Sequence, residues 1–163
     1  MAGGAGTLIM GVQMSHILLI AHTPLASALR AGAMHVFPEA ADAITALDVQ
    51  PQASPDATLA EAERALAQVP ESESVLILTD VFGATPCNVA QRVADGTRTL
   101  LLVGANLPMV LRAVTYRHED LDAMAHKALS GGMQGIMLVA GTAPQNQNRR
   151  AVSHDQARDH HQQ

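Results

Sequence analysis

The stretch HILLIAHTP, residues 16–24, indicates the fold class of this chain. Residues 16–21 form a short apolar run without the alternation of a half-exposed strand, which is typical of a strand buried on both faces. Thr23 and Pro24 follow at once as a helix-start signal. A buried strand that leads directly into a helix is typical of a parallel sheet covered by helices. His22 then stands at the carboxyl edge of that sheet, where open α/β folds bind ligands.

The alternation of short apolar runs and helical periodicity continues to residue 140. Because the connections are short and such crossovers are right-handed, we predict an α/β fold with three layers, α/β/α, around a central, mainly parallel sheet. Four strands are expected to be parallel, with a fifth strand at an edge. The predicted strands cover residues 16–21, 44–49, 75–80, 99–104 and 136–140, and the predicted helices cover residues 24–36, 57–69, 86–94, 108–116 and 120–129.

Three further helices carry start signals. Polar side chains that cap free amides, and proline at the first helical position, are the features that mark them. In chain order the signals are Thr58 with Glu61 at capping-box spacing, or in competition Ser54 with Pro55; then Thr85 with Pro86; then Asn106 or Leu107 with Pro108.

Composition narrows the function classes. A chain of 163 residues with 48% hydrophobic residues is expected to fold as one domain, and aromatic residues supply only 2% of it. The formal charge of −5 and the lack of a Lys/Arg block argue against nucleic-acid binding. The single cysteine excludes an internal disulfide framework and fits a reducing, cytoplasmic location. Small molecules or proteins are the expected partners.

The two ends of the chain differ from its centre. Residues 1–13 carry neither a signal-peptide pattern nor an apolar stretch long enough to insert into a membrane, so we expect a flexible extension. Residues 142–163 are polar, and we expect a disordered tail. The predicted domain is therefore residues 14–141.

Polar and turn-forming residues follow three of the predicted strands. They occupy residues 22–24, 80–86 and 104–108, and all three segments open at the same edge of a parallel sheet. Turns alone account for the glycines and prolines. They do not account for a histidine and an aspartate at strand ends.

These residues suit phosphohistidine chemistry. A neutral imidazole is a good nucleophile near neutral pH, and Asp80 is a candidate to fix its tautomer by accepting a hydrogen bond from Nδ1. The loop from Gly83 through Ala84 to Thr85 leads into a helix whose free amides can hold a phosphoryl group without a metal ion. No nucleotide-binding glycine motif is present, so the donor is expected to be another protein.

Other chemistries fit less well. Cys87 and Arg92 are separated by four residues, one fewer than a cysteine phosphatase loop needs, and Ser27 lacks a nucleophile-elbow motif. The histidine pairs at 16 and 22 and at 118 and 126 lack metal-site spacing. We therefore expect no metal and no cofactor.

Three segments carry a resemblance to a known family. They are ILLIAHTPLASALRAGA at 17–33, VLILTDVFGATPCNVAQR at 75–92 and LLLVGANLPMVLRAV at 100–114. In this order and spacing they resemble the mannose-family (mannose/fructose/sorbose) enzyme IIA domain of the bacterial phosphoenolpyruvate-dependent sugar phosphotransferase system. The resemblance covers residues 15–140, nearly the whole predicted domain.

The resemblance implies roles for individual residues. It implies that His22 carries the phosphoryl group and that Asp80 orients it. It places the Ser/Thr of the loop after the third strand on Thr85. From the loops at the strand ends we further predict a phosphoryl-binding set and three side chains that line the site. The phosphoryl-binding set is Thr23, Gly83, Ala84, Thr85 and Pro86, and the site-lining set is Phe82, Asn106 and Pro108.

The resemblance also implies partners. A cytoplasmic phosphocarrier of this kind takes its phosphoryl group from the histidine protein HPr and passes it to a separate IIB component, usually as a homodimer that exchanges its last strand. The chain departs from many relatives at Thr23-Pro24 and at Ala84, where they have glycine. Two alternatives stay open: a regulatory protein whose phosphorylation state selects its partners, and a structural domain without chemistry.

Overall fold

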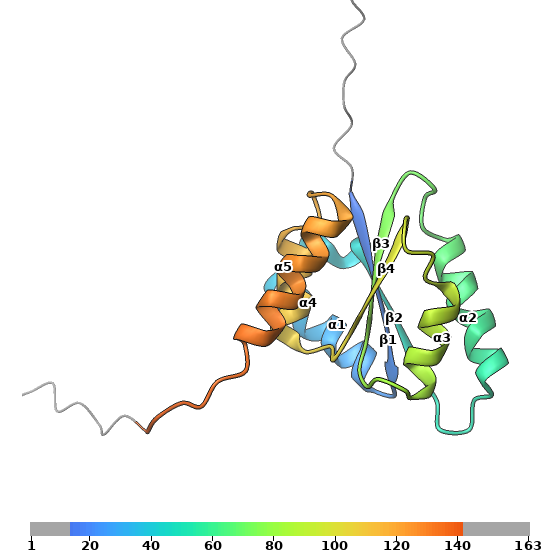
Figure 1. Cartoon of the computed structure of the whole chain (residues 1–163), viewed down its shortest axis with the longest axis horizontal. Helices are drawn as coiled ribbons and strands as arrows, with labels where there is room; N and C mark the ends of the chain where they lie inside the picture. The colour runs from blue at the N-terminus through green and yellow to red at the C-terminus, as the bar shows by residue number, and fades with distance from the viewer. Residues whose placement is uncertain (1–13, 142–163) are drawn as a thin grey trace, which may run out of the picture.

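The computed structural model describes residues 14–141 and shows a four-stranded, all-parallel sheet between two layers of helices (Figure 1). The strand order is β2-β1-β3-β4, so β2 and β4 are the edge strands. The elements, in chain order, are β1 (Ser15–His22), α1 (Leu25–Val36), a 3-10 helix (Pro38–Ala43), β2 (Ile44–Val49), α2 (Pro55–Ala67), β3 (Ser74–Thr79), α3 (Thr85–Val93), β4 (Thr99–Val103), α4 (Leu107–Thr115) and α5 (Leu121–Gln134). The predicted α/β fold with four parallel strands is confirmed.

Two apolar cores cover the two faces of the sheet. On one face, side chains such as Ile17 and Leu19 of β1 pack against α1, α4 and α5. On the other face, Leu18 and Ile20 pack against α2 and α3. The central strands are therefore buried on both sides, which is why they appear in the sequence as continuous apolar runs.

Some helix boundaries differ from the predicted ones. Helix α2 begins at Pro55, and the side chain of Ser54 accepts a hydrogen bond from the amide of Ala57 at 3.1 Å. The capping box at Thr58 is not formed, because Thr58 is buried and its hydroxyl donates to the carbonyl of Ser54. Helix α4 does begin with Asn106 as N-cap, whose side chain accepts from the amide of Met109 at 3.0 Å.

Helix α5 runs past its predicted end at residue 129, continuing through two adjacent glycines to Gln134. A Cβ at Gly131 would overlap the Arg112 side chain of α4, and one at Gly132 would lie 2.8 Å from the Cε of Met109. Close packing against α4 therefore accounts for a helical segment that propensity disfavours.

Residues 136–140 are not a strand in this single chain. They leave the end of α5 and extend away from the sheet (Figure 1). Their apolar side chains are exposed, from 70% at Met137 to 100% at Leu138. The expectations for residues 1–13 and 142–163 lie outside the described residues. Between residues 14 and 141, no helix is both long and apolar enough to span a bilayer.

A side chain bonds to the backbone at one edge of the sheet. Arg30 of α1 donates from Nε to the carbonyl of Ile44 at 2.8 Å and from Nη2 to that of Ala41 at 2.9 Å. It therefore occupies a backbone acceptor of the edge strand β2, an arrangement that discourages pairing with another strand.

His16 is buried at the start of β1, and its Nε2 lies 2.8 Å from the hydroxyl of Thr45. Burial lowers the pKa of His16 below its ordinary value of 6.5, while the nearby charge of Glu73 opposes the shift in part. The folded protein therefore binds a proton at this site less readily than the unfolded chain does.

We therefore expect the free energy of unfolding to fall as the pH drops below 6.5, because the unfolded chain then takes up a proton that the folded state resists. Urea unfolding at about pH 7.5 and about pH 5 measures this loss. His16→Gln should show a smaller loss than wild type, whereas His126→Gln, a change at an exposed histidine of α5, should not. Equal losses in wild type and His16→Gln would contradict the assignment.

Candidate functional site

The site lies where the chain turns to opposite faces after two neighbouring strands. Strand β1 leads into α1 on one face, and β3 leads towards α3 on the other (Figure 1). The register pairs Ile20 with Thr79, so the residues that follow, His22 and Asp80, come to the same edge. Such a switch point leaves a crevice at the carboxyl ends of the strands, where α/β folds bind ligands.

Asp80 contacts both the backbone and the ring of His22. Its Oδ2 accepts the amide N–H of His22 at 3.0 Å and lies 2.7 Å from Nδ1 of the ring. Its Oδ1 accepts the amide of Val81 at 2.8 Å. Both oxygens are thus held by donors of the chain itself.

The two partners differ in exposure. The imidazole of His22 is 51% exposed, whereas the Asp80 side chain is only 7% exposed. Burial raises the pKa of the Asp80 carboxyl, but the hydrogen bonds from His22 and Val81 together outweigh burial and leave the pKa below its ordinary value. Asp80 is therefore ionised at neutral pH, and a carboxylate only accepts, so in the neutral ring of His22 the proton lies on Nδ1 and Nε2 keeps its lone pair.

The loop after β3 has a backbone that suits its residues. Gly83 has a φ of +81°, a conformation that favours glycine, while Ala84 has a φ of −87° and accommodates its Cβ without strain. The side chain of Asn88 donates to the carbonyl of Gly83 at 3.2 Å and braces the turn. Asn88 was not singled out from the sequence. Its position as the last residue of the TPCN helix start, residues 85–88, could have indicated this role.

The start of α3 has no side-chain cap. Its N-cap residue is Ala84 rather than Thr85 as predicted, so Thr85 and Pro86 are the first two helical residues. Alanine offers no oxygen to the first-turn amides, and these amides form the positive end of the helix. Thr85 is half-buried and lines a cavity of about 100 Å³ with Pro55, Asn88, Val89 and Arg92.

A free amide at the start of α1 is bonded to Asp48, a residue that the sequence analysis did not single out. The N-cap position is Pro24, which has no capping side chain, and Asp48 at the end of β2 accepts the amide of Ser27 at 3.1 Å instead. The amide of Thr23 donates to the carbonyl of Val49 at 3.1 Å. Like Asp80, Asp48 is a polar residue at the end of a strand. The apolar run before Asp48 is weaker, so the sequence did not mark it as clearly.

Other predicted residues lie in different surroundings. Asn106 donates to the carbonyl of Gly132 at 3.3 Å, and the ring of Pro108 packs against Gly135, so both contact the end of α5. Phe82 is 75% exposed beside the site. Cys87 is fully buried in α3, which removes the phosphatase interpretation.

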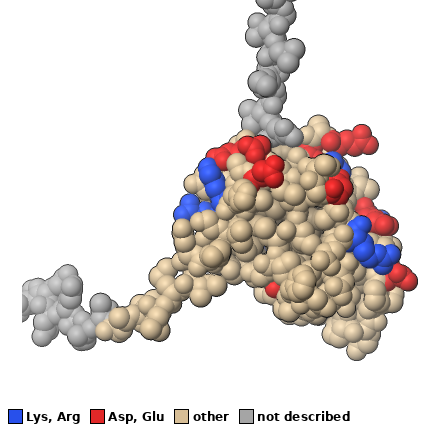
Figure 2. All heavy atoms as spheres, viewed as in Figure 1, with Lys and Arg blue, Asp and Glu red and all other residues tan. Residues whose placement is uncertain are grey.

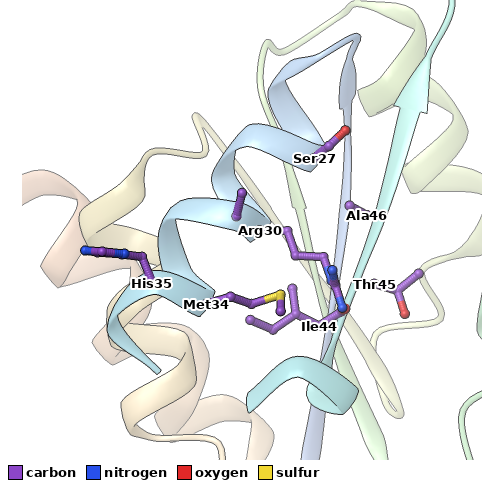
Figure 3. Close-up of a pocket in the computed structure, with 8 residues that line it drawn as sticks. Ser27, Arg30, Met34, His35, Ile44, Thr45 and Ala46 are labelled. Atoms are coloured by element: carbon purple, nitrogen blue, oxygen red, sulfur yellow. The ribbon is translucent and has the colours of Figure 1, made fainter. Parts of the chain in front are cut away.

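A larger cavity of about 760 Å³ lies along α1 and the edge strand β2, and Ser27, Arg30, Met34 and His35 are among the residues that line it. Figure 3 shows Arg30 and Met34 pointing towards β2 and His35 pointing away from it. The Arg30 guanidinium is engaged by the two backbone carbonyls there. In residues 14–141, no cluster of three or more His, Cys, Asp or Glu could hold a metal ion.

Comparison with known proteins identifies the family and agrees with the fold. The chain belongs to the family described as the PTS system fructose IIA component, whose model matches residues 16–129 of the 163. The resemblance inferred from the three sequence segments is thereby confirmed.

Two curated relatives match over part of their length. The PTS system fructose-specific EIIA component of Bacillus subtilis is 39% identical over 57 residues, which cover 34% of this chain and 39% of that protein. The mannose-specific EIIAB component of Escherichia coli K12 is 27% identical over 93 residues, which cover 55% of this chain and 29% of that protein. The matches thus span well under half of these relatives.

Solved structures share the fold. The mannose/sorbose-specific IIA subunit of Enterococcus faecalis has a TM-score of 0.71 at 23% identity, covering 80% of this chain and 98% of that one. The component EIIA of Streptococcus agalactiae has a TM-score of 0.67 at 22% identity, covering 76% and 96%.

The geometry predicts the tautomer of His22. In wild type, Asp80 should hold the proton on Nδ1, so the ¹⁵N shifts should mark Nε2 as the unprotonated nitrogen above the histidine pKa. In Asp80→Ala the ring loses this acceptor and should shift towards the Nε2–H form, while exposed His35 serves as the internal reference. A protonated Nε2 in neutral wild-type His22 would contradict the prediction.

Proposed function

We propose that this protein is a phosphocarrier of the sugar phosphotransferase system that receives a phosphoryl group on Nε2 of His22. The observation that carries the proposal is the 2.7 Å contact between Nδ1 of a half-exposed His22 and the shielded carboxylate of Asp80. This contact leaves the outer nitrogen free and fixes its direction. Family membership supplies the reaction class.

The proposed transfer starts from the phosphohistidine of HPr. Nε2 of His22 attacks the phosphorus in line, a new N–P bond forms, and the N–P bond of the donor breaks. The donor ring leaves with the electron pair of the broken bond, while the proton on Nδ1 of His22 stays on its bond to Asp80. The imidazole of His22 gains positive character in the product, which the Asp80 carboxylate stabilises.

The start of α3 is the better placed of two helix ends to hold the phosphoryl oxygens. At α1, Asp48 already takes the amide of Ser27, and the amide of Thr23 is bonded to Val49, so Thr23 has only its hydroxyl to contribute. At α3, no side chain caps the helix. We therefore propose that the amides of Gly83 and Thr85 donate to the phosphoryl group. The amide of Ala84 donates to the carbonyl of Val81 at 3.4 Å, so Ala84 shapes the phosphoryl-binding loop, and Pro86 sets the helix direction.

The phosphoryl group then passes to a separate IIB component in the cytoplasm. The same in-line geometry serves the second transfer, because Nε2 becomes the leaving nitrogen and the ring returns to its starting tautomer. No group of the site has to exchange a proton with water between the two steps. Asp80 thus holds the same Nδ1 proton throughout the cycle.

Incubation with phosphoenolpyruvate, enzyme I and HPr should label the wild-type protein with an adduct that is labile in acid and stable in base. His22→Ala should abolish the label, whereas His35→Ala, at an exposed histidine of α1, should retain it. Asp80→Ala should slow labelling by at least about tenfold, since a lost positioning partner costs that much or more. A His22→Ala protein that still takes up the label would refute the site.

We further propose that the protein forms a homodimer in which residues 136–140 of each copy add to the open β4 edge of the other. The side chains of Ile136, Met137, Leu138 and Val139 are 70% or more exposed. Exposed apolar residues in a chain whose sheet has an open edge favour strand addition between copies. The β2 edge is less suited because Arg30 bonds to its backbone.

Leu138→Asp should weaken this dimer, because a charge replaces the most exposed apolar side chain of the segment. Sedimentation velocity at several concentrations measures the effect. Val36→Asp, at an exposed position at the far end of α1, is the matched control and should sediment like wild type. Identical sedimentation of wild type and Leu138→Asp would argue against the exchange.

A further inference from the structure

Asn88 of α3 bonds to the loop that connects Asp80 to that helix. Its Nδ2 donates to the carbonyl of Gly83 at 3.2 Å, five residues earlier in the chain. The residue is exposed, whereas its neighbours Cys87 and Val89 are buried. Asn88 thus contributes a hydrogen bond to the loop rather than packing to the core of the protein.

The carbonyl of Gly83 belongs to the peptide group that joins Gly83 to Ala84. The amide of the same peptide group, on Ala84, donates to the carbonyl of Val81 at 3.4 Å. Both polar atoms of this peptide group are therefore bonded, and the bond from Asn88 is the shorter of the two. Because hydrogen bonds weaken as they lengthen, Asn88 is the main restraint on the orientation of this peptide group.

The two amides proposed to bind the phosphoryl group lie on either side of this peptide group. The amide of Gly83 precedes it in the chain, and the amide of Thr85 follows it. Gly83 has a φ of +81°, and glycine adopts positive and negative φ about equally, so the residue itself does not fix the path of the loop. The restraint on the central peptide group therefore sets the directions of both outer amides.

The segments that follow the strands at this edge are poor in positive charge. Residues 22–27, 80–86 and 104–108 contain no Lys or Arg. In Figure 2 the acidic and basic side chains gather at the end of the body where the strands begin and along its flanks, and the lower part is almost uncharged. In these segments, neutral donors are left to meet the negative charge of a phosphoryl group on His22, and their strength depends on their alignment.

From these contacts we infer that Asn88 is a positioning residue for phosphoryl transfer: its bond to the Gly83 carbonyl holds the amides of Gly83 and Thr85 in the direction that the phosphoryl oxygens require. The inference rests on the proposed function and adds to it a residue that acts through the loop. No covalent bond to Asn88 forms or breaks in the transfer, and its amide protons stay in place. Donors held in advance stabilise the charge that develops during the transfer, so the effect of Asn88 belongs to kcat.

Asn88→Ala should lower kcat for the labelling of His22 by phospho-HPr at least about tenfold, because misaligned donors stabilise the transferred group less well. The KM should change by less than about twofold, since the lost bond joins two parts of this chain and does not involve the donor protein. Gln91→Ala, at an exposed residue of the same helix, is the matched control and should leave kcat and KM unchanged.

Asn88→Leu separates the hydrogen bond from the shape of the side chain. Leucine keeps the branched shape and the neutrality of asparagine but has no group that donates a hydrogen bond. It should lower kcat as much as Asn88→Ala does, and a kcat close to wild type in either variant would overturn the inference. Thermal unfolding of each variant checks that it is folded at the temperature of the assay.

The ¹H–¹⁵N amide signals measure the alignment directly, and a change in stability alone would not move them. After complete labelling of wild type, the signals of Gly83 and Thr85 should shift, because both amides then donate to the phosphoryl group. These shifts should be smaller in labelled Asn88→Ala and should match wild type in labelled Gln91→Ala. Equal shifts in Asn88→Ala and wild type, or no shift at either amide in wild type, would overturn the inference.

Labelling of the wild-type protein separates this inference from the proposed function. If wild type labels on His22 and both Asn88 variants keep its kcat, the role of Asn88 is wrong while the phosphocarrier function stands. If wild type takes no label from phospho-HPr, the proposed function is wrong, and the role of Asn88 with it.

Discussion

The arrangement of the site depends on a single carboxylate that bonds to a histidine twice. Oδ2 of Asp80 takes both the amide and the ring Nδ1 of His22, so the backbone and side chain of one residue are fixed by one atom of another. Two neighbouring parallel strands are needed to bring these groups together. The sheet register makes this contact possible, and the tautomer of the ring follows from it.

The starts of α1 and α3 differ in whether a carboxylate of the chain already accepts their free amides. Asp48 satisfies the start of α1, where the N-cap is a proline, and so it stabilises the turn that carries His22. The start of α3 lacks such a cap. The carboxylate of Asp48 and the proposed phosphoryl site thus belong to separate helix ends, and they do not compete for the same amides.

The parallel sheet and the positions of His22 and Asp80 could be predicted from the sequence. The doubly buried strands left continuous apolar runs, and His22 and Asp80 stood at strand ends, where polar residues are otherwise unexpected. The N-cap Asn106 followed from its position before a proline, but its second role, tying the loop to Gly132, depends on a helix distant in sequence. The extension of α5 through Gly131 and Gly132 likewise depends on the packing of α4, which no local pattern encodes.

The guanidinium of Arg30 is bonded to the carbonyls of Ile44 and Ala41, which affects how copies of this chain can assemble through their sheet edges. A sheet with two free edges can polymerise without limit, as in fibrils, whereas a sheet with one free edge can add strands on one side only. When two such chains donate a segment to each other, each open edge is filled and none is left to recruit a third. In the proposed dimer, the bond from Arg30 to the carbonyl of Ile44 would therefore disfavour the addition of a third chain at the β2 edge.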